Sequence, residues 1–528
     1  MLPIRCRILT FPRSERSTIR RFMSRTLYDQ AGYALKWNYV GVAVKSFSSL
    51  AVGIVLARLL GPKPFGLVAV AALIIGFGNL LADFGFGAAI VQREDVTEED
   101  LRFVFLFQML SGVALGGACF LGAGLIARLF RNSEVAPVIR ALSLVFPLQA
   151  FGQTAINLLR RKLAFRALQA AQVSGHLTYL VAGVALALLG YGVWALVAAQ
   201  LVQVALTSII AFALAPHSLK VSFRINRPIV QFGTKVLGSN IANWAIGNLD
   251  NAFVGRVFGA VPLGLYSRAF QLTSAPTSAI MPGLQSVLFA ASSRAQGRVD
   301  ALRRAYLASF SVVAVVTVPL FAAVAAIPTT VILALYGPKW VGSVPMLVPL
   351  ALAMPLFALL CVAGPLLWGI GKVGRELRVQ LVTAMLAVVV FSAACRFSVV
   401  LLAWGVLGVY AFRLALLTRE LTHHLRVAWM EMVAAVRGGI ALGLLAAPLA
   451  WVCNRLCTHT PLPKVFTLAV AMLAVLAEAG LCLAAAPRAV LGPHAEMILT
   501  QVRSVAPNWI RKAFAAPRPE QEKEGQVV

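Results

Sequence analysis

Residues 57–67 read Ala-Arg-Leu-Leu-Gly-Pro-Lys-Pro-Phe-Gly-Leu, and residues 255–265 read Gly-Arg-Val-Phe-Gly-Ala-Val-Pro-Leu-Gly-Leu. The two stretches share the frame small-Arg-apolar-apolar-Gly-x-x-Pro-apolar-Gly-Leu, and the same interval separates Gly85 from Gly283. Each copy is typical of a tight outside turn between two helices, because Gly permits unusual backbone angles, Pro favours the first helical turn and Arg reaches lipid headgroups. The repeat predicts a duplication into two halves of like orientation, as in parallel transporter repeats.

Apolar runs with short polar breaks surround these turns, from Trp37 to Pro487. The chain of 528 residues is 60% hydrophobic and 12% charged, with a mean hydropathy of +0.83, which excludes a water-soluble fold. Stretches such as 65–90 are apolar on every side, so helices and not barrel strands cross the bilayer. We expect an all-α integral membrane protein of about fourteen transmembrane helices: two parallel, pseudo-symmetric six-helix lobes plus two C-terminal helices.

The distribution of basic residues sets the expected orientation. With a cytoplasmic amino terminus, most of the 47 Lys and Arg residues fall in segments predicted inside, which is the positive-inside pattern. An even number of spans then places both termini of this multi-pass chain in the cytoplasm. The expected segments are a basic N-tail (1–35), an N-lobe (36–215), a cytoplasmic linker (216–228), a C-lobe (229–420), an amphipathic segment with the last two spans (421–487) and a cytoplasmic, partly disordered C-tail (488–528).

Several function classes are disfavoured by the sequence. The net charge of +28 does not indicate nucleic acid, because no basic run interleaves with stacking aromatics. There is no Gly-rich phosphate loop, nucleophile elbow or zinc-spaced His pair, so the chain is not expected to be an enzyme or its own ATP-driven pump. Seven cysteines are too scattered for a disulfide framework. We expect no cofactor and no metal.

The acidic run from Glu94 to Asp100 looks like a cation site but has a simpler interpretation. Thr97 is followed three residues later by Asp100, directly before an apolar run. This spacing predicts a capping box at the start of a helix, with the carboxylates near the positive end of its dipole.

Ionisable groups at bilayer depth are candidates for function, because burying their charge in a bilayer is costly. Lys45 and Lys235 lie within predicted spans, with snorkelling to the cytoplasm as the alternative. Asp83 lies near the inner end of the second span. Its position fits helix capping or headgroup contact as well as it fits a role in transport. Other such groups are His176 in the fifth span and Glu478 in the fourteenth.

The seventh predicted span carries a polar stripe. Its members fall on one helical face: Asn240, Asn243, Gly247, Asp250 and Asn251. A stripe of this length facing lipid would be prohibitive, so it is expected to line a lobe interface or a water-filled cavity. Hydrogen bonding between helices is the structural alternative.

Segments of both halves resemble a known family: 57–62, 65–67, 83–89, 92–100, 248–251 and 264–267. They are similar to polysaccharide (Wzx-type) exporters of the multidrug/oligosaccharidyl-lipid/polysaccharide (MOP) superfamily, nearest to the colanic acid and teichuronic acid exporters. The likeness runs from about Tyr28 to Arg419 and fades over the last two spans. It implies a V-shaped, MATE-like transporter that flips undecaprenyl-diphosphate-linked oligosaccharide repeat units between leaflets by alternating access. It also implies a glycan polymerase and a chain-length regulator as partners, with no nucleic acid.

The candidate site residues follow from this combination. Cationic and amide side chains suit a diphosphate and a sugar, and the expected substrate-binding residues are Lys45, Lys235, Asn240, Asn243, Asn251, Arg58 and Arg256. The candidates for ion coupling are Asp83, Asp250 and His176. The alternatives are a multidrug/cation antiporter of the same superfamily and a membrane glycan polymerase or transferase.

Overall fold

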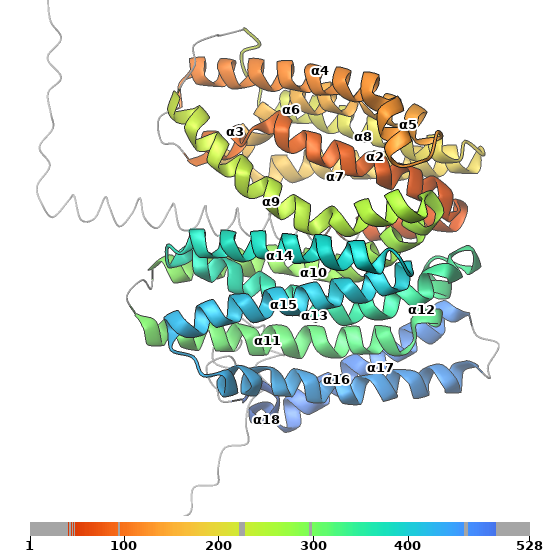
Figure 1. The fold of residues 1–528 in the computed structure, drawn as a ribbon, viewed down its shortest axis with the longest axis vertical. Coiled ribbons are helices and arrows are strands. Elements are labelled where there is room, and N and C mark those ends of the chain that lie inside the picture. The colour runs from red at the N-terminus through yellow and green to blue at the C-terminus, as the bar shows by residue number, and fades with distance from the viewer. Residues whose placement is uncertain are drawn as a thin grey trace, which may run out of the picture. The chain divides into compact units, whose positions relative to one another are not determined.

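The computed structural model describes residues 41, 44, 46, 48–92, 96–220, 227–294, 298–458 and 463–492. These residues form helices joined by short turns and include no strand, which confirms the predicted all-α class (Figure 1). After a helix at Ser48–Leu59, the elements are α2 (Pro62–Asp83), α3 (Phe86–Gln92), α4 (Glu98–Leu129), α5 (Val135–Leu142), α6 (Val145–Arg161), α7 (Phe165–Leu188), α8 (Val193–Leu214), α9 (Arg227–Phe258), α10 (Ala260–Arg294), α11 (Val299–Ala326), α12 (Pro328–Leu335), the 3-10 helix η1 (Pro338–Ser343), α13 (Val344–Gly369), α14 (Val373–Ala394), α15 (Val399–Leu425), α16 (Trp429–Thr458), α17 (Lys464–Ala485) and α18 (Pro487–Leu491).

Eleven segments within the described residues are long and apolar enough to cross a membrane. Helices α9 and α10 are also long enough, at 32 and 35 residues, but carry more polar side chains. The first predicted span is described only in part. The total of fourteen spans therefore stays a prediction, as does the six-segment division of the chain.

The two repeat copies form tight turns between helices, as predicted. The first turn ends where α2 begins at Pro62, and the second consists of Gly259 between α9 and α10. Gly259 has a φ of +88°, in the left-handed region that favours glycine. The aligned prolines Pro64 and Pro262 both lie in the first turn of their helices, where a missing N–H costs nothing.

The two turns also contact each other reciprocally. A Cβ on Gly66 would lie 1.7 Å from the carbonyl oxygen of Ala260, and a Cβ on Gly264 would lie 2.0 Å from that of Pro62. In the repeat alignment Gly66 corresponds to Gly264 and Pro62 to Ala260. The same surface is thus used on both copies, as across a twofold axis.

The chain divides into two compact units. Unit 1 comprises Met1–Val52, Ile74–Leu125 and Ala136–Asn240. Within it α6 packs against α3 and α8, and α7 packs against α8. Leu158, Leu168 and neighbouring small residues fill the core between these helices.

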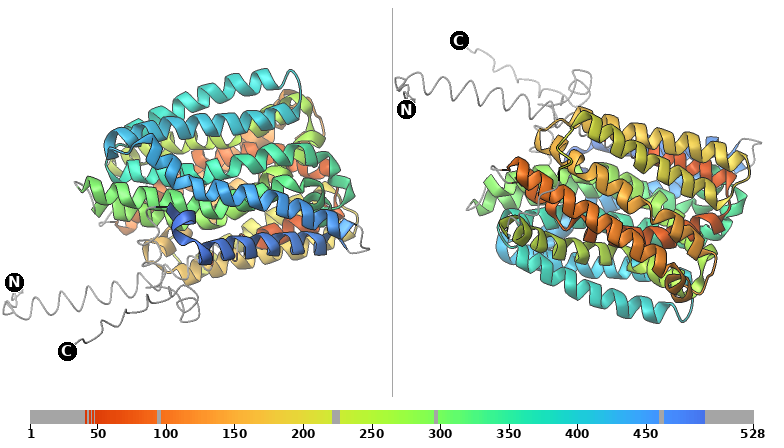
Figure 2. Two further views of the ribbon diagram at one scale, coloured as in Figure 1. Left: turned by 90° about the horizontal axis from the view of Figure 1, so that it is seen from below. Right: turned by 90° about the horizontal axis from the view of Figure 1, so that it is seen from above.

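Unit 2 comprises Gly53–Leu73, Ile126–Val135 and Ile241–Val528. Helix α13 lies at its centre, packed against α10, α11 and α15 (Figure 1). Helices α16 and α17, blue in Figure 2, pack against each other, and α16 also packs against α11.

The predicted capping box at the start of α4 is confirmed. The backbone N–H of Thr97 donates to Asp100 Oδ2 at 3.0 Å, and the backbone N–H of Asp100 donates to Thr97 Oγ1 at 3.2 Å. Two otherwise unpaired donors are satisfied in this way. Asp100 thus holds the helix start, whereas Glu94 and Asp95 lie outside the described residues.

Candidate functional site

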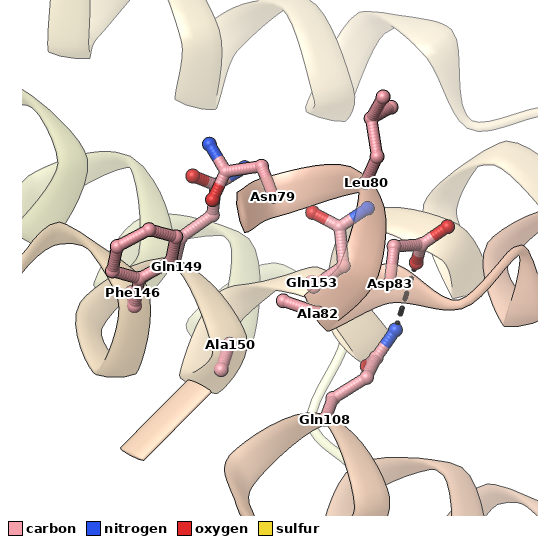
Figure 3. A pocket seen from close by; sticks show the side chains of 9 residues that line it. All are labelled: Asn79, Leu80, Ala82, Asp83, Gln108, Phe146, Gln149, Ala150 and Gln153. Atoms are coloured by element: carbon pink, nitrogen blue, oxygen red, sulfur yellow. Dashed lines mark hydrogen bonds between the residues drawn. The ribbon is translucent and has the colours of Figure 1, made fainter. Parts of the chain in front are cut away.

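A pocket in unit 1 gathers uncharged polar side chains from three helices (Figure 3). Its volume is ≈ 160 Å³, and we call it the amide pocket. Its lining residues are Asn79, Leu80, Ala82 and Asp83 from α2, Gln108 from α4, and Phe146, Gln149, Ala150 and Gln153 from α6. Asn79 and Asp83 are four residues apart on α2, as are Gln149 and Gln153 on α6, so each pair lies on one helical face.

Gln108 is locked in a single orientation at the base of the pocket. Its Nε2 donates to Asp83 Oδ1 at 3.0 Å, and its Oε1 accepts from Thr154 Oγ1 at 2.8 Å. Both Gln108 and Thr154 are buried. The bond to the Asp83 carboxylate assigns the NH₂ group, because an ionised carboxylate only accepts.

The Asp83 carboxylate has further partners behind the pocket. It accepts from the backbone N–H groups of Gly85 and Gly87, and Arg160 near the end of α6 attracts it electrostatically. Phe84 and Gly85 have φ values of +49° and +74°, so the chain turns directly after α2, where these N–H groups meet the carboxylate. The acid is therefore held in place by the end of its own helix.

Three amides of the pocket have no hydrogen-bond partner among the residues that the structure describes. These are the side chains of Asn79, Gln149 and Gln153. All three are partly exposed and lie among the side chains that line the pocket (Figure 3). An unpaired amide is costly where water is scarce, so this hydrogen-bonding capacity is available to a ligand.

A second polar cluster, the buried acid cluster, centres on Asp250 of unit 2. Asp250 is 4% exposed. Its Oδ2 accepts from the Tyr266 hydroxyl at 2.6 Å, and its Oδ1 accepts from Asn251 Nδ2 at 3.1 Å and from the Asn251 backbone N–H at 2.7 Å. Tyr410 of α15 is a further electrostatic neighbour. A carboxylate so enclosed can exchange a proton or accept a cation only when its surroundings open.

A buried ion pair lies on α14 and α15 of the same unit. Arg413 Nη2 lies 3.5 Å from Glu376 Oε1, and the two side chains are 14% and 5% exposed. Glu376 also accepts from Trp368 Nε1 at 2.8 Å and from Gln380. The amide of Gln380 donates in addition to Asn243 Oδ1 at 3.0 Å, which links α14 to α9.

The predicted substrate-binding residues are distributed over several environments. Lys45 and the side chain of Lys235 lie outside the described residues. Asn240 and Asn243 are exposed on α9, whereas Arg256 is partly buried near the end of that helix. Within the α9 stripe, Asp250 and Asn251 are hydrogen-bonded to each other, and Asn243 is hydrogen-bonded to Gln380 of α14.

Arg58 contacts the protein itself. Its Nε donates to the carbonyl of Leu335 at 2.8 Å, and its Nη2 donates to that of Ala334. These are orphan carbonyls at the C-terminal end of α12, which a guanidinium stabilises by charge as well as by hydrogen bonding. The nearby Trp340 Nε1 donates to the carbonyl of Ala57 at 2.8 Å, so both side chains fasten the first repeat turn to the segment after α11.

His176, a candidate for ion coupling, is engaged within unit 1. Its Nδ1 lies 2.9 Å from the carbonyl of Gln172 on the same helix and 3.4 Å from Gln203 Nε2 on α8. These contacts join α7 to α8. The role of His176 in coupling stays a prediction.

Sequence reasoning missed the amide pocket and the Glu376–Arg413 pair. The signal for the pocket was present as uncharged amides four residues apart in otherwise apolar spans, such as Gln149 and Gln153. Glu376 fell one residue outside the predicted eleventh span, at a boundary that is uncertain by several residues. Arg413 lies within α15, in the twelfth predicted span, and was not singled out.

Comparison with known sequences identifies relatives of the chain. Residues 55–345 match the family described as polysaccharide biosynthesis protein. The chain is 28% identical over 320 residues to the succinoglycan biosynthesis transport protein ExoT of Rhizobium meliloti (strain 1021), covering 60% of this chain and 65% of the relative. It is 26% identical over 337 residues to the lipopolysaccharide biosynthesis protein WzxC of Escherichia coli (strain K12), covering 62% and 66%.

A third relative is the teichuronic acid biosynthesis protein TuaB of Bacillus subtilis (strain 168). It is 27% identical over 301 residues, covering 56% of this chain and 62% of the relative. The matched regions thus span less than two thirds of the length of each of the three relatives.

Solved structures establish the fold. The inward closed conformation of the lipid II flippase MurJ superposes with a TM-score of 0.66 at 11% identity, covering 84% of this chain and 98% of that chain. An inward-facing multidrug resistance MATE family transporter of the MOP superfamily gives a TM-score of 0.54 at 18% identity, covering 77% and 95%. The chain therefore has the MOP fold of a multi-pass membrane protein, as predicted.

Proposed function

The chain belongs to the family of polysaccharide biosynthesis proteins, and on that premise we propose that it flips lipid-linked oligosaccharide precursors of a surface polysaccharide. The proposed substrate is an undecaprenyl-diphosphate-linked repeat unit, moved from the cytoplasmic to the periplasmic leaflet of the bacterial inner membrane by alternating access of two lobes. In this proposal both termini are cytoplasmic. The chain acts as a transporter without catalysis, next to a glycan polymerase and a chain-length regulator.

The relatives and the fold support this proposal. Two relatives bear the names of a succinoglycan transport protein and a lipopolysaccharide biosynthesis protein, and the MurJ fold is that of a lipid II flippase. A membrane potential that is negative inside favours outward movement of anions by about 2.3 kcal/mol per charge per 100 mV. A diphosphate carrier can therefore be driven without ATP.

The amide pocket is the single observation that carries the proposal. A helix that only spans lipid gains nothing from unpaired amides, whereas a transporter of sugars needs them in a sheltered and wet place. Lys45, Lys235, Arg58, Arg256 and the Asn240–Asn251 face are proposed to contact the headgroup or the glycan. Asp83, Asp250 and His176 are proposed to couple transport to an ion.

A leaflet-accessibility assay tests the proposal. Inside-out vesicles from a strain lacking the gene receive a labelled lipid-linked precursor in their outer, cytoplasmic leaflet, and its exposure on the opposite leaflet is followed by an impermeant glycosidase enclosed in the vesicle lumen. We expect exposure only when the chain is restored. Normal surface glycan in the deletion strain, or precursor exposure at an equal rate without the chain, would contradict the proposal.

A cation-coupled drug antiporter is the second candidate, because the chain has a MATE-like fold and a buried acid at Asp250. It predicts increased sensitivity to cationic drugs on deletion, with normal surface glycan. The two phenotypes separate the candidates in one strain.

A further inference from the structure

The free groups of the amide pocket match a ligand that both donates and accepts hydrogen bonds. Each amide of Asn79, Gln149 and Gln153 offers two N–H donors and one carbonyl acceptor. A cation would use only the acceptors, and a phosphate would use only the donors. A ring of hydroxyl groups uses both, because every hydroxyl donates once and accepts as well.

The apolar part of the lining is closely packed. The Phe146 side chain is 1% exposed and packs against Gly78, where a Cβ would lie 2.5 Å from its Cε1 and Cζ atoms. Ala150 and Ala82 complete the apolar part of the surface. The hydrogen bonds that orient a ligand therefore come from the amides.

Size and charge narrow the ligand further. A volume of ≈ 160 Å³ lies below the range of about 300–1,000 Å³ for pockets that take drug-sized ligands, so the pocket suits a small group such as one sugar ring. Among the described residues that line it, Asp83 alone carries a formal charge. Its carboxylate accepts from sugar hydroxyls but repels the carboxylate of an acidic sugar.

We propose that the amide pocket is a subsite for one neutral pyranose ring of the glycan, bound by Asn79, Gln149 and Gln153. The inference rests on the proposed function, because the ring belongs to the transported oligosaccharide. It adds a place and a selectivity: neutral sugars enter the pocket and uronic acids do not. The locked Gln108 keeps Asp83 in position from below.

Binding of simple glycosides to the full-length purified protein in nanodiscs tests the proposal. The probes are methyl β-D-glucopyranoside, N-acetylglucosamine and methyl β-D-glucuronide, followed by saturation-transfer NMR over a concentration series. We expect the two neutral sugars to bind and the glucuronide to bind at least about tenfold more weakly. Gln149→Leu and Gln153→Leu should each weaken binding of the neutral sugars by about threefold to tenfold, the range for one lost hydrogen bond.

Gln200→Leu is the matched control, because Gln200 is an amide on the apolar helix α8 that does not line the pocket. It should bind the neutral sugars as the unaltered protein does. The subsite would be overturned by unchanged binding in both pocket variants or by absence of neutral-sugar binding. It would also be overturned if the protein bound sodium in place of sugar and this binding depended on Gln153.

The leaflet assay separates this outcome from failure of the proposed function. Flipping that proceeds while the pocket variants bind sugar normally removes the subsite alone. If sugar binding depends on the pocket but deletion of the gene leaves glycan export intact, the proposal of a flippase is rejected and the proposal of a sugar subsite stands.

Discussion

The hydroxyl of Tyr266 on α10 donates a 2.6 Å hydrogen bond to Oδ2 of Asp250 on α9. Both side chains are buried, at 0% and 4% exposure. The bond joins the two helices that follow and precede the second repeat turn, so the acid and the turn form one rigid element.

Removing the Tyr266 hydroxyl should destabilise the protein. Tyr266→Phe leaves a buried carboxylate oxygen without its donor, which costs about 1–3 kcal/mol. Thermal melting in detergent measures the loss, and Tyr191→Phe, at a site that is 56% exposed, is the control. Equal melting temperatures for the two variants would show that the bond contributes nothing.

Asp250→Asn tests the coupling role of the acid. The variant keeps the size of the side chain but cannot take up and release a proton. We expect normal membrane insertion with loss of most glycan export in a complementation assay. Full complementation would remove Asp250 from the coupling candidates while leaving the flippase proposal intact.

The Glu376–Arg413 pair should show strong energetic coupling. Glu376→Leu leaves the guanidinium of Arg413 buried without its counter-ion, and breaking a buried pair from one side costs about 3–5 kcal/mol. The double variant Glu376→Leu/Arg413→Leu removes both charges and should cost clearly less than the sum of the single variants. A double-mutant cycle of denaturation free energies measures the difference, and additivity would contradict it.

The reciprocal glycine contact should tolerate no side chain. Gly66→Ala and Gly264→Ala place a Cβ within 2.0 Å of a backbone oxygen, which forces the helices apart and costs about 1–3 kcal/mol or more. Gly61→Ala, in the adjacent turn with nothing within 4 Å of its Cβ, is the control. If the melting temperature of the control decreased as much as that of the two variants, the glycine contact would not be the cause of the destabilisation.

His217 predicts a pH dependence of stability. His217 follows the end of α8 and lies outside the spans. Its ring is 5.0 Å from the Phe105 ring and 5.3 Å from the Phe212 ring. Burial lowers the pKa of His217 below its ordinary value of 6.5, although a hydrogen bond to the Ser218 carbonyl opposes the change. Between the lowered pKa and pH 6.5, His217 is therefore protonated in the unfolded chain but mostly neutral in the folded chain. The free energy of unfolding decreases as the pH falls through this range.

The variant His217→Phe should remove this contribution. Its melting temperature should decrease less between pH 7.5 and pH 5 than that of the unaltered protein. Identical pH profiles would show that the ring is protonated equally in both states.

The sequence predicted features that depend on residues close together in the chain. The capping box needed only Thr97 and Asp100, three positions apart, and the repeat turns needed only their Gly and Pro frame. The amide pocket depends on the meeting of α2, α4 and α6, which no local pattern specifies. Gln108 and Gln153 therefore looked like isolated polar residues until the fold brought them together.

A charged residue within a span is easier to single out in the sequence than an uncharged polar one, for a related reason. A carboxylate such as Asp250 is costly in a bilayer wherever it lies, and so attracts attention in isolation. An amide such as Asn79 costs less and is often satisfied by a neighbouring helix. Only the hydrogen-bond partners seen in the structure distinguish an amide that joins two helices from one that remains available to a ligand.

The meeting of Gly66 with Gly264 has an evolutionary consequence. A half-length ancestor carrying one such turn would have formed a symmetric dimer through it, each copy pressing its glycine against the other's carbonyl. Fusion of two genes would keep that meeting point while freeing the two halves to diverge elsewhere. Positions 66 and 264 are then restricted to glycine together, whereas positions 62 and 260 contribute only backbone carbonyls and can differ, as Pro62 and Ala260 do.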